Sequence, residues 1–340
     1  MRALTKMMGR SLTAGVISMI ALGSFATSPA TAQVEMKAFS IWTSRDSQQG
    51  GLPLIAAKKG FFAKEGLDVD VKFVSSGSEI PAGMVGGTIL VGVASWVNPM
   101  QMKANGLPAV VLAQATDQTD TQQLVVKTSG PVKAPKDLNG KKLGITKIGV
   151  MLSLLDRMCK EYGCDPSTIQ LVNMLPQDIL LAYKKGDVDA ILTWEPYVTF
   201  AAQDGGTVLA SAQKSYMPGQ PGGRLDGQYA AVFALRDFVG KNPKTIEAML
   251  KGMRAAAEWT NANKKEAGEI ITKEMNIPGE VVQKIMSEVT YTVTLDEAWA
   301  KEFDGIATYL LNAKELKGPV TAKDLFVAEP LKAACPACVK

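Results

Sequence analysis

Short apolar runs alternate with amphipathic stretches along the chain from Val34 onward. The runs have the length of buried strands and the stretches repeat apolar residues at helical spacing, so the pattern predicts an α/β protein. Pro53 and Gly66 mark the two ends of a first helix, and Ser76-Gly77-Ser78-Glu79 has the form of a capping box. In this first series the pattern predicts strands at 36–42, 69–74, 89–94 and 109–115 and helices at 52–65 and 98–105.

A polar stretch at 116–120 separates this series from a second one. The second series predicts strands at 122–127, 142–146, 169–173 and 190–194 and helices at 150–162, 176–185 and 196–203. Glycines and prolines within 217–227 then turn the chain back. A strand at 229–235 and helices at 243–262, 264–275, 279–289 and 297–311 follow. We therefore expect one lobe built from 33–116 and 225–340, including the C-terminal helices, and a second lobe from 117–224.

The first 32 residues have the pattern of a cleavable export signal. Arg2, Lys6 and Arg10 precede an apolar stretch at 12–26, and Ala30-Thr31-Ala32 provides small residues before the expected cleavage point. The apolar stretch is short for a membrane span. We therefore expect residues 1–32 to be a signal peptide and the mature protein to be periplasmic.

Composition excludes several classes of function. The chain contains no histidine, which rules out Ser-His-Asp or Cys-His catalysis and imidazole metal sites. Residues 33–340 hold 34 basic and 33 acidic side chains, so the expected mature chain is nearly neutral and has no charge signature of nucleic-acid binding. We expect no catalytic residue, no metal ligand and no cofactor. The length after residue 32 suffices for two separate cores.

Four cysteines fall in two close pairs, Cys159 with Cys164 and Cys335 with Cys338. In an oxidising compartment disulfides are expected, and four cysteines allow three connectivities. The two local pairs are favoured because Gly163 can turn the chain after a helix and bring Cys164 back. The Cys335-Pro336-Ala337-Cys338 spacing matches a redox motif, but it lies outside the strand-to-helix context that such a motif requires.

Four sequence segments resemble those of a known family: residues 57–69, 137–144, 186–197 and 236–243. Together they resemble the periplasmic substrate-binding proteins of ABC importers, in the nitrate, sulfonate and taurine group with the type II fold. The resemblance implies two lobes, each a mostly parallel sheet flanked by helices, joined by two crossing strands. It also implies a solute bound between the lobes, a membrane permease as partner, and a monomer.

Ligands of parallel sheets bind beyond the carboxyl ends of the strands, so the candidate site is taken from those ends. We expect Arg45 and two helix N-termini, near Ser76 and Thr146, to hold an anionic group, and three tryptophans to enclose the organic part. Structural roles compete: a strand-end tryptophan can cover the core, Ser76 can be only a cap, and Asp117 can serve a turn. The predicted ligand-binding set is Trp42, Arg45, Ser76, Ser78, Ser95, Trp96, Asp117, Thr146, Lys147, Trp194 and Glu195.

The function predicted first is a solute receptor that binds an organic sulfonate or a taurine-like zwitterion. Lys147 stands in a turn where the resembling family usually has small hydroxyl residues, and Glu195 offers a carboxylate. A cationic or heterocyclic amine is therefore the alternative ligand. An enzyme of the same fold is the third reading, and it is weakened because the related pyrimidine synthase uses a histidine and a cysteine-rich motif that this chain lacks.

Overall fold

The computed structural model describes residues 33–74, 76–220 and 222–340. Residues 1–32, where the signal peptide is predicted, lie outside this range. Val34–Lys340 forms one compact unit. No helix in the described ranges has the length and apolar character needed to span a membrane.

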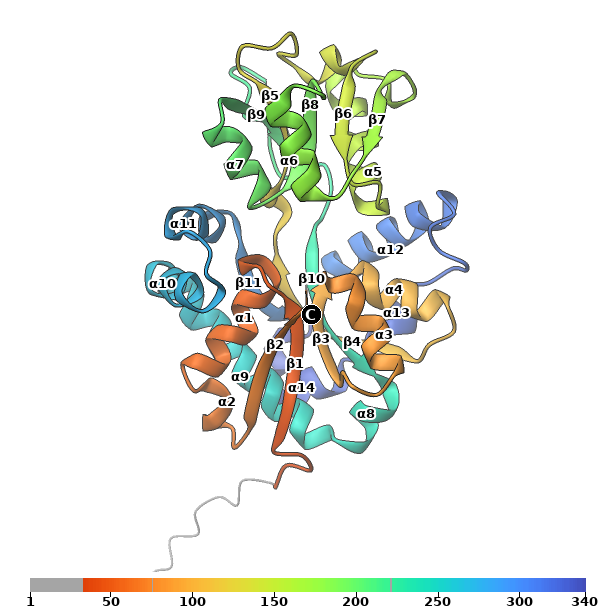
Figure 1. Cartoon of the computed structure of the whole chain (residues 1–340). Coiled ribbons are helices and arrows are strands. Elements are labelled where there is room, and N and C mark those ends of the chain that lie inside the picture. Colours follow the sequence, from red (N-terminus) through yellow and green to blue (C-terminus); the bar gives the residue numbers. More distant parts are fainter. Residues whose placement is uncertain (1–32, 75, 221) are drawn as a thin grey trace, which may run out of the picture. The chain divides into compact units, whose positions relative to one another are not determined.

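The first sheet contains six strands in the order β11-β4-β10-β3-β1-β2 (Figure 1). β1 pairs in parallel with β2 and β3, whereas β10 is antiparallel to both β3 and β4, and β11 is antiparallel to β4. The strands are β1 (Ala38–Ser44), β2 (Asp68–Val74), β3 (Val91–Ser95), β4 (Ala109–Asp117), β10 (Tyr229–Leu235) and β11 (Thr290–Thr294).

The second sheet contains five strands in the order β7-β6-β8-β5-β9. β6 is parallel to β7 and β8, and β5 is antiparallel to β8 and β9. The strands are β5 (Gln122–Lys127), β6 (Lys142–Ile145), β7 (Gln170–Asn173), β8 (Ala190–Trp194) and β9 (Gly206–Ser211). The predicted α/β architecture with two sheets is confirmed, and the strands that enter and leave each sheet at the crossings form the antiparallel pairs.

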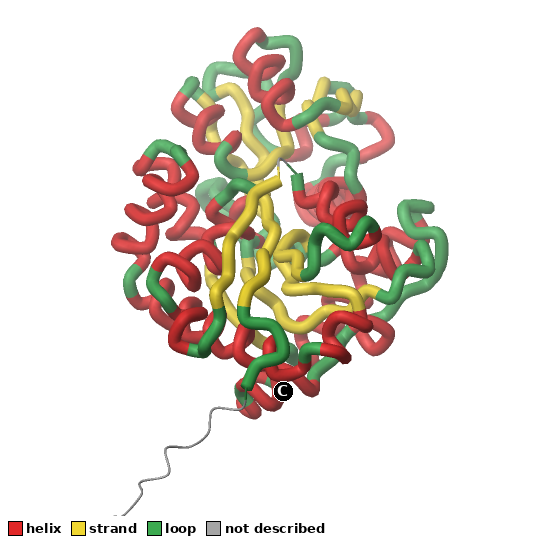
Figure 2. Tube along the Cα trace, turned by 60° about the horizontal axis from the view of Figure 1, so that its bottom comes forward, coloured by secondary structure: helices red, strands yellow, loops and turns green. Residues whose placement is uncertain are grey.

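Helices lie on both sides of the first sheet (Figure 2) and flank the second. We use "first lobe" for the six-stranded sheet with its helices and "second lobe" for the five-stranded sheet with α5 to α7. The helices of the first lobe are α1 (Ser47–Lys58), α2 (Phe61–Lys64), α3 (Ile80–Val85), α4 (Val97–Ala104), α8 (Arg236–Lys241), α9 (Pro243–Ala262), α10 (Lys264–Met275), α11 (Gly279–Glu288), α12 (Glu297–Asn312), α13 (Ala322–Leu325) and α14 (Glu329–Ala334). Those of the second lobe are α5 (Gly149–Tyr162), α6 (Pro176–Lys185) and α7 (Tyr197–Gln203).

Helix α1 begins five residues earlier than the hydrophobic pattern predicts. Asp46 caps it, because its carboxylate accepts a hydrogen bond of 2.7 Å from the backbone N–H of Gln49. Gly50 allows the first turn to pack closely, since a Cβ there would lie 2.5 Å from the carbonyl oxygen of Ser44. The polar first turn of α1 is therefore held against the end of β1.

The cores and the disulfides complete the fold. A large apolar cluster extends through both lobes, and a smaller one lies between α6, α7 and the second sheet. The structure pairs Cys159 with Cys164 at the end of α5 and Cys335 with Cys338 after α14. β9 and β11 were not predicted from the sequence.

Candidate binding site at the facing strand edges

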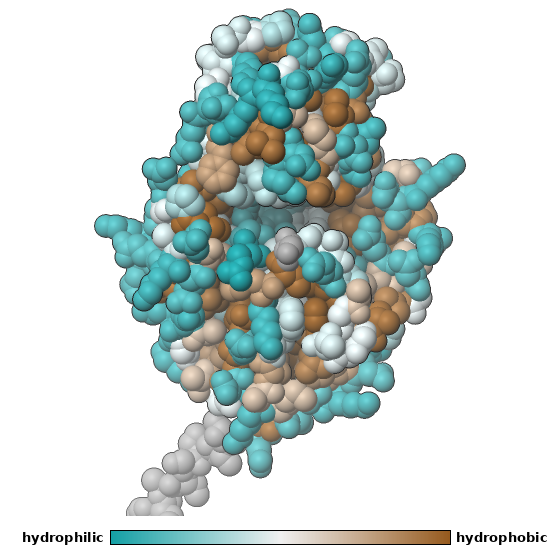
Figure 3. Space-filling model, in the orientation of Figure 1, coloured by the Kyte–Doolittle hydropathy of each residue, from teal (hydrophilic) through white to brown (hydrophobic). Residues whose placement is uncertain are grey.

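The carboxyl ends of the parallel strands in the two sheets lie next to the same crossing segment. Asp117 at the end of β4 pairs with Tyr229, and the next residue of β10, Ala230, pairs with Ser95 at the end of β3. Only Gln118–Thr121 separate β4 from β5, whose first residue, Gln122, pairs with Trp194 at the end of β8. The strand ends of both sheets therefore border one region, and Figure 3 shows a recess at this level.

The first-lobe side of this region is polar. Arg45 is exposed beyond β1, with its guanidinium carbon 4.7 Å from the centre of the Phe73 ring, and no carboxylate among the described residues pairs with it. The hydroxyls of Ser76 and Ser78 lie 2.8 Å apart and are exposed. Ser95 is half-buried and accepts a weak hydrogen bond from the N–H of Val97. These four predicted residues end neighbouring strands of one sheet.

The helix N-termini at the site differ in how far their N–H groups are already satisfied. At Ser76 the capping box is present: Glu79 accepts from the Ser76 N–H at 2.8 Å, and the Ser76 hydroxyl accepts from the N–H of Ser78. At α1 the carboxylate of Asp46 accepts from backbone amides, which lower its pKa, while burial raises the pKa more strongly, to about 6. No described side chain caps α5, which Ile148 precedes. Among the described residues, helix α6, which Leu175 precedes, also has no side-chain cap, and Gly149 at the start of α5 is buried against Leu310 of α12. Neither of these two N-termini has its first N–H groups satisfied by a described side chain, so either can interact with an anion.

Thr146, Lys147 and Trp194 lie at the second-lobe edge. The Thr146 hydroxyl donates to the carbonyl oxygen of Met174 at 2.8 Å, and the Lys147 N–H donates to the Asn173 side chain at 2.9 Å. Lys147 is exposed and Trp194 is half-buried. The loops that follow β6 and β7 are thus tied together beside the end of β8.

The three tryptophans do not enclose one cavity, which corrects the sequence-based expectation. Trp96 is fully buried, stacked on Trp299 at 6.2 Å and edge-on to Tyr229 at 4.7 Å. It therefore belongs to the core that α12 covers. Trp42 pairs with Gly92 within the sheet, on the face that α3 covers, and Lys72 lies over its ring. Trp96 and Trp194 both lie at strand ends, but only Trp194 is partly exposed there.

The carboxylate of Asp117 has a partner within the protein. Its carboxylate pairs with Arg224 at 3.1 Å and accepts from the N–H of Thr119 at 3.0 Å. Arg224 also contacts Glu302 of α12 at 3.4 Å and the hydroxyl of Tyr229. This ion network ties both crossing segments to α12, so the turn role of Asp117 is the one that the structure displays.

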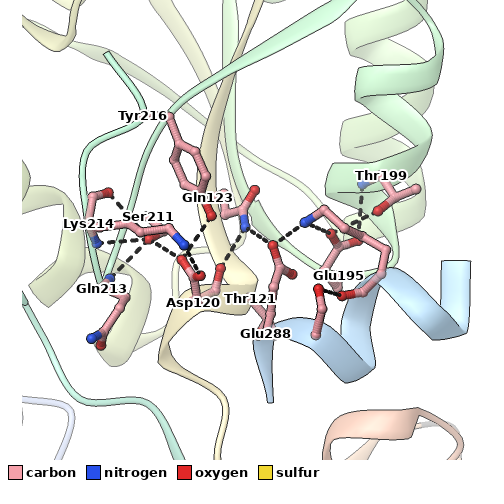
Figure 4. A network of polar contacts seen from close by, with 12 residues as sticks. Asp120, Thr121, Gln123, Glu195, Thr199, Ser211, Gln213, Lys214, Tyr216 and Glu288 are labelled. Atoms are coloured by element: carbon pink, nitrogen blue, oxygen red, sulfur yellow. Dashed lines mark hydrogen bonds and ion pairs between the residues drawn. The ribbon is translucent and has the colours of Figure 1, made fainter. Parts of the chain in front are cut away.

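Glu195 is buried, and its carboxylate lies between the start of α7 and helix α11 (Figure 4). It accepts from the N–H and the hydroxyl of Thr199, at 3.0 and 2.8 Å, at the start of α7. Lys284 of α11 lies 3.8 Å from the same carboxylate. Burial and the nearby charge of Glu288 raise the pKa of Glu195 to about 7, although Thr199 and Lys284 oppose the shift. The described contacts of this carboxylate are all with protein groups.

The same polar network links α11 to the crossing segments (Figure 4). The amide of Gln123 donates to the Glu288 carboxylate at 2.9 Å and to the carbonyl oxygen of Asp120 at 2.6 Å. Asp120 in turn pairs with Lys214 at 2.8 Å and accepts from the hydroxyl of Tyr216 at 3.0 Å. These contacts connect the first lobe to the root of the second lobe.

Four buried polar residues near the crossing were missed from the sequence. Ser47 Oγ, Gln48 Oε1, Gln118 Oε1 and Gln228 Nε2 have no hydrogen-bond partner within the described ranges. Gln48 bridges the lobes, because its side-chain Nε2 donates to the backbone carbonyl oxygen of Glu195 at 2.8 Å. The backbone carbonyl oxygen of Gln48 accepts from the hydroxyl of Thr116 at 2.8 Å. The capping pattern from Asp46 to Gln49 was the available signal, because it places Gln48 in the first turn of α1.

Two surface depressions, of about 460 and 510 Å³, lie between α10 and α11 and at the junction of α9 and α10, and Lys265 and Glu269 line both. They hold none of the predicted site residues. In the part of the chain that the structure describes, no group of three or more acidic or cysteine side chains has the arrangement of a metal site.

Comparison with known proteins places these observations in a family. The taurine-binding periplasmic protein of Escherichia coli (strain K12) is 30% identical over 212 residues, which cover 62% of this chain and 63% of that protein. The match thus spans less than two-thirds of that relative. The 4-amino-5-hydroxymethyl-2-methylpyrimidine phosphate synthase THI11 of Saccharomyces cerevisiae is 28% identical over 113 residues, 33% of each chain.

Among solved structures, the periplasmic aliphatic sulphonate binding protein SsuA from Escherichia coli has the same fold. It superposes with a TM-score of 0.71 at 20% sequence identity and covers 84% of this chain and 96% of that one. The family model described as NMT1/THI5 like matches residues 51–267. The chain therefore belongs to the NMT1/THI5-like family.

Proposed function

We propose that this protein is the solute receptor of an ABC importer and binds an organic sulfonate or a taurine-like zwitterion between its two lobes. The relatives named for taurine and for aliphatic sulphonates support the ligand class. In the proposal, Arg45 and the uncapped N-terminus of α5 attract the anionic group from opposite lobes.

The observation that carries the proposal is the facing of the two strand edges across short crossing segments. Ligands of such sheets bind at these edges, and a lobe whose backbone is connected to the other lobe only through crossing segments can close on a solute. We place the moving boundary near residues 117 and 224, with 33–116 and 225–340 in one lobe and 117–224 in the other. Closure is then driven by the ligand's higher affinity for the closed state.

The proposal includes the cellular setting. Residues 1–32 would direct export, the mature chain would act in the periplasm as a monomer, and a membrane permease would recognise the closed receptor. Binding without chemical turnover is part of the proposal, since the catalytic histidine that the resembling enzymes use is absent from this sequence.

A thermal-shift screen of the mature protein tests the ligand class. We expect taurine or an alkanesulfonate to raise Tm, because a ligand that binds only the folded state stabilises it by mass action. Arg45→Met should abolish the shift, whereas Arg236→Met, which alters an exposed arginine on α8, should leave it unchanged. A shift that survives Arg45→Met, or product formation from any ligand in the panel, would contradict the proposal.

A cationic or heterocyclic amine is the second candidate. It is favoured by the buried, unpartnered oxygens of Gln48 and Gln118, which can accept from a ligand N–H. The same screen separates the candidates, because amines and pyrimidines that lack an anionic group would then raise Tm and simple sulfonates would not.

A further inference from the structure

Two large apolar side chains are exposed at the second-lobe edge. Ile148, directly before α5, is 42% exposed, and Leu175, directly before α6, is 58% exposed. Both follow the carboxyl ends of neighbouring parallel strands. Their apolar surface is therefore placed at the edge of the sheet where a solute is expected to bind.

The strand registers set these residues side by side with Trp194. Ile145 of β6 pairs with Asn173 of β7 and with Leu192 of β8, so the loops beyond them run level with the end of β8. The hydrogen bond from Thr146 to the Met174 carbonyl holds the two loops together. Ile148, Leu175 and Trp194 thus form an apolar row along the second-lobe edge.

The first-lobe edge carries polar and charged side chains. Arg45, Ser76 and Ser78 are exposed there, whereas the apolar row lies on the other lobe. The large apolar residues that are exposed in the described ranges number five, and two of them are Ile148 and Leu175. Arg45 on the first-lobe edge and the apolar row beside the exposed Lys147 on the second-lobe edge together match a solute with an anionic head and an apolar body.

We infer that Ile148 and Leu175 are specificity-determining residues that select an organic anion with an alkyl or aryl body. The inference rests on the proposed function and narrows it: the row would bury the apolar body while Arg45 meets the head. A small zwitterion or an inorganic anion has no apolar surface to cover the row. Such ligands should therefore bind more weakly than long-chain ones.

Titration calorimetry with n-alkanesulfonates of increasing chain length, alongside taurine and nitrate, tests the inference. We expect Kd to fall roughly three- to fourfold for each methylene that becomes buried. In the double variant Ile148→Ala, Leu175→Ala this dependence on chain length should be lost while methanesulfonate affinity stays within about twofold. Leu181→Ala is the matched control, because Leu181 of α6 is 55% exposed but lies outside the row.

The outcomes separate the inference from the function on which it rests. If sulfonates bind with no dependence on chain length, or if the double variant retains the dependence, the inference is overturned and the proposed function stands. A parallel series of n-alkylcarboxylates and n-alkylamines covers the other case. Chain-length dependence in that series without sulfonate binding would support the apolar row and overturn the sulfonate proposal, and no binding in any series would overturn both.

Discussion

Replacing Glu195 with glutamine should stabilise the protein at alkaline pH and not at acidic pH. Glutamine is isosteric with glutamate, and its side-chain oxygen and amide can retain both contacts to Thr199. The variant therefore removes the charge and little else. Because the side chain is buried, the charge carries a desolvation cost that the half-exposed Lys284, at 3.8 Å, offsets only in part.

The size of the change in unfolding free energy follows from the pKa of Glu195. Folding raises the pKa of Glu195 from 4.5 to about 7, chiefly by burial, so the folded state binds its proton more tightly than the unfolded state does. The stability that the tighter proton binding of Glu195 contributes to the folded state is fully present below pH 4.5. It is lost as the pH rises through 7, where the folded protein gives up this proton. At 1.36 kcal/mol per pKa unit, the loss amounts to about 3 kcal/mol at pH 8.

Urea unfolding at pH 5 and pH 8 measures this difference. We expect Glu195→Gln to exceed the parent free energy of unfolding by up to about 3 kcal/mol at pH 8 and by only a small amount at pH 5. Asp46 and Asp226, whose pKa values burial raises to about 6, titrate in both proteins and so cancel in the comparison. Glu269→Gln, at an exposed glutamate of α10, is the control. An equal effect of Glu195→Gln at both pH values would refute the reasoning.

Three further substitutions probe the described contacts. Trp96→Phe should cost about 1–2 kcal/mol of unfolding free energy through lost packing and leave solute affinity unchanged; weaker binding at unchanged stability would restore Trp96 to the site. Arg224→Met should lower the free energy of unfolding by about 1 kcal/mol, measured by urea denaturation, because it leaves Asp117 and Glu302 unpaired; an unchanged value would show that the ion network contributes nothing. Replacing Cys159 and Cys164 together by serine should cost roughly 2 kcal/mol for so short a loop and lower Tm; a Tm equal to that of the parent would contradict this estimate.

The sequence predicted the elements whose apolar residues have a regular period. The parallel strands of both sheets and the long helices of the first lobe lie close to the predicted ranges. The first turn of α1 was missed because Ser47 to Gly51 contains no apolar residue, and close packing of glycine against Ser44 holds it instead. β11 was missed although Thr290–Thr294 alternates polar and apolar residues, because the preceding helical pattern was extended to its edge.

The ends of the strands were predicted more reliably than the directions of the side chains that follow them. Strand ends can be found from hydrophobic runs, and Arg45, Ser76 and Lys147 do follow the ends of β1, β2 and β6. The direction of each side chain depends on what covers each face of the sheet. Ser95 and Trp96 are consecutive, yet only Trp96 packs under α12, and no local pattern in the sequence reveals that partner.

The discontinuous first sheet sets an order for folding. β3 and β4 hydrogen-bond to β10, and β4 also pairs with β11, so the centre of this sheet cannot assemble until the chain beyond residue 229 is available. The second sheet draws all its strands from 122–211, a continuous stretch with much shorter loops to close. The strands of the second lobe can therefore pair early, whereas the central strands of the first sheet pair only after both flanking segments of the chain are present.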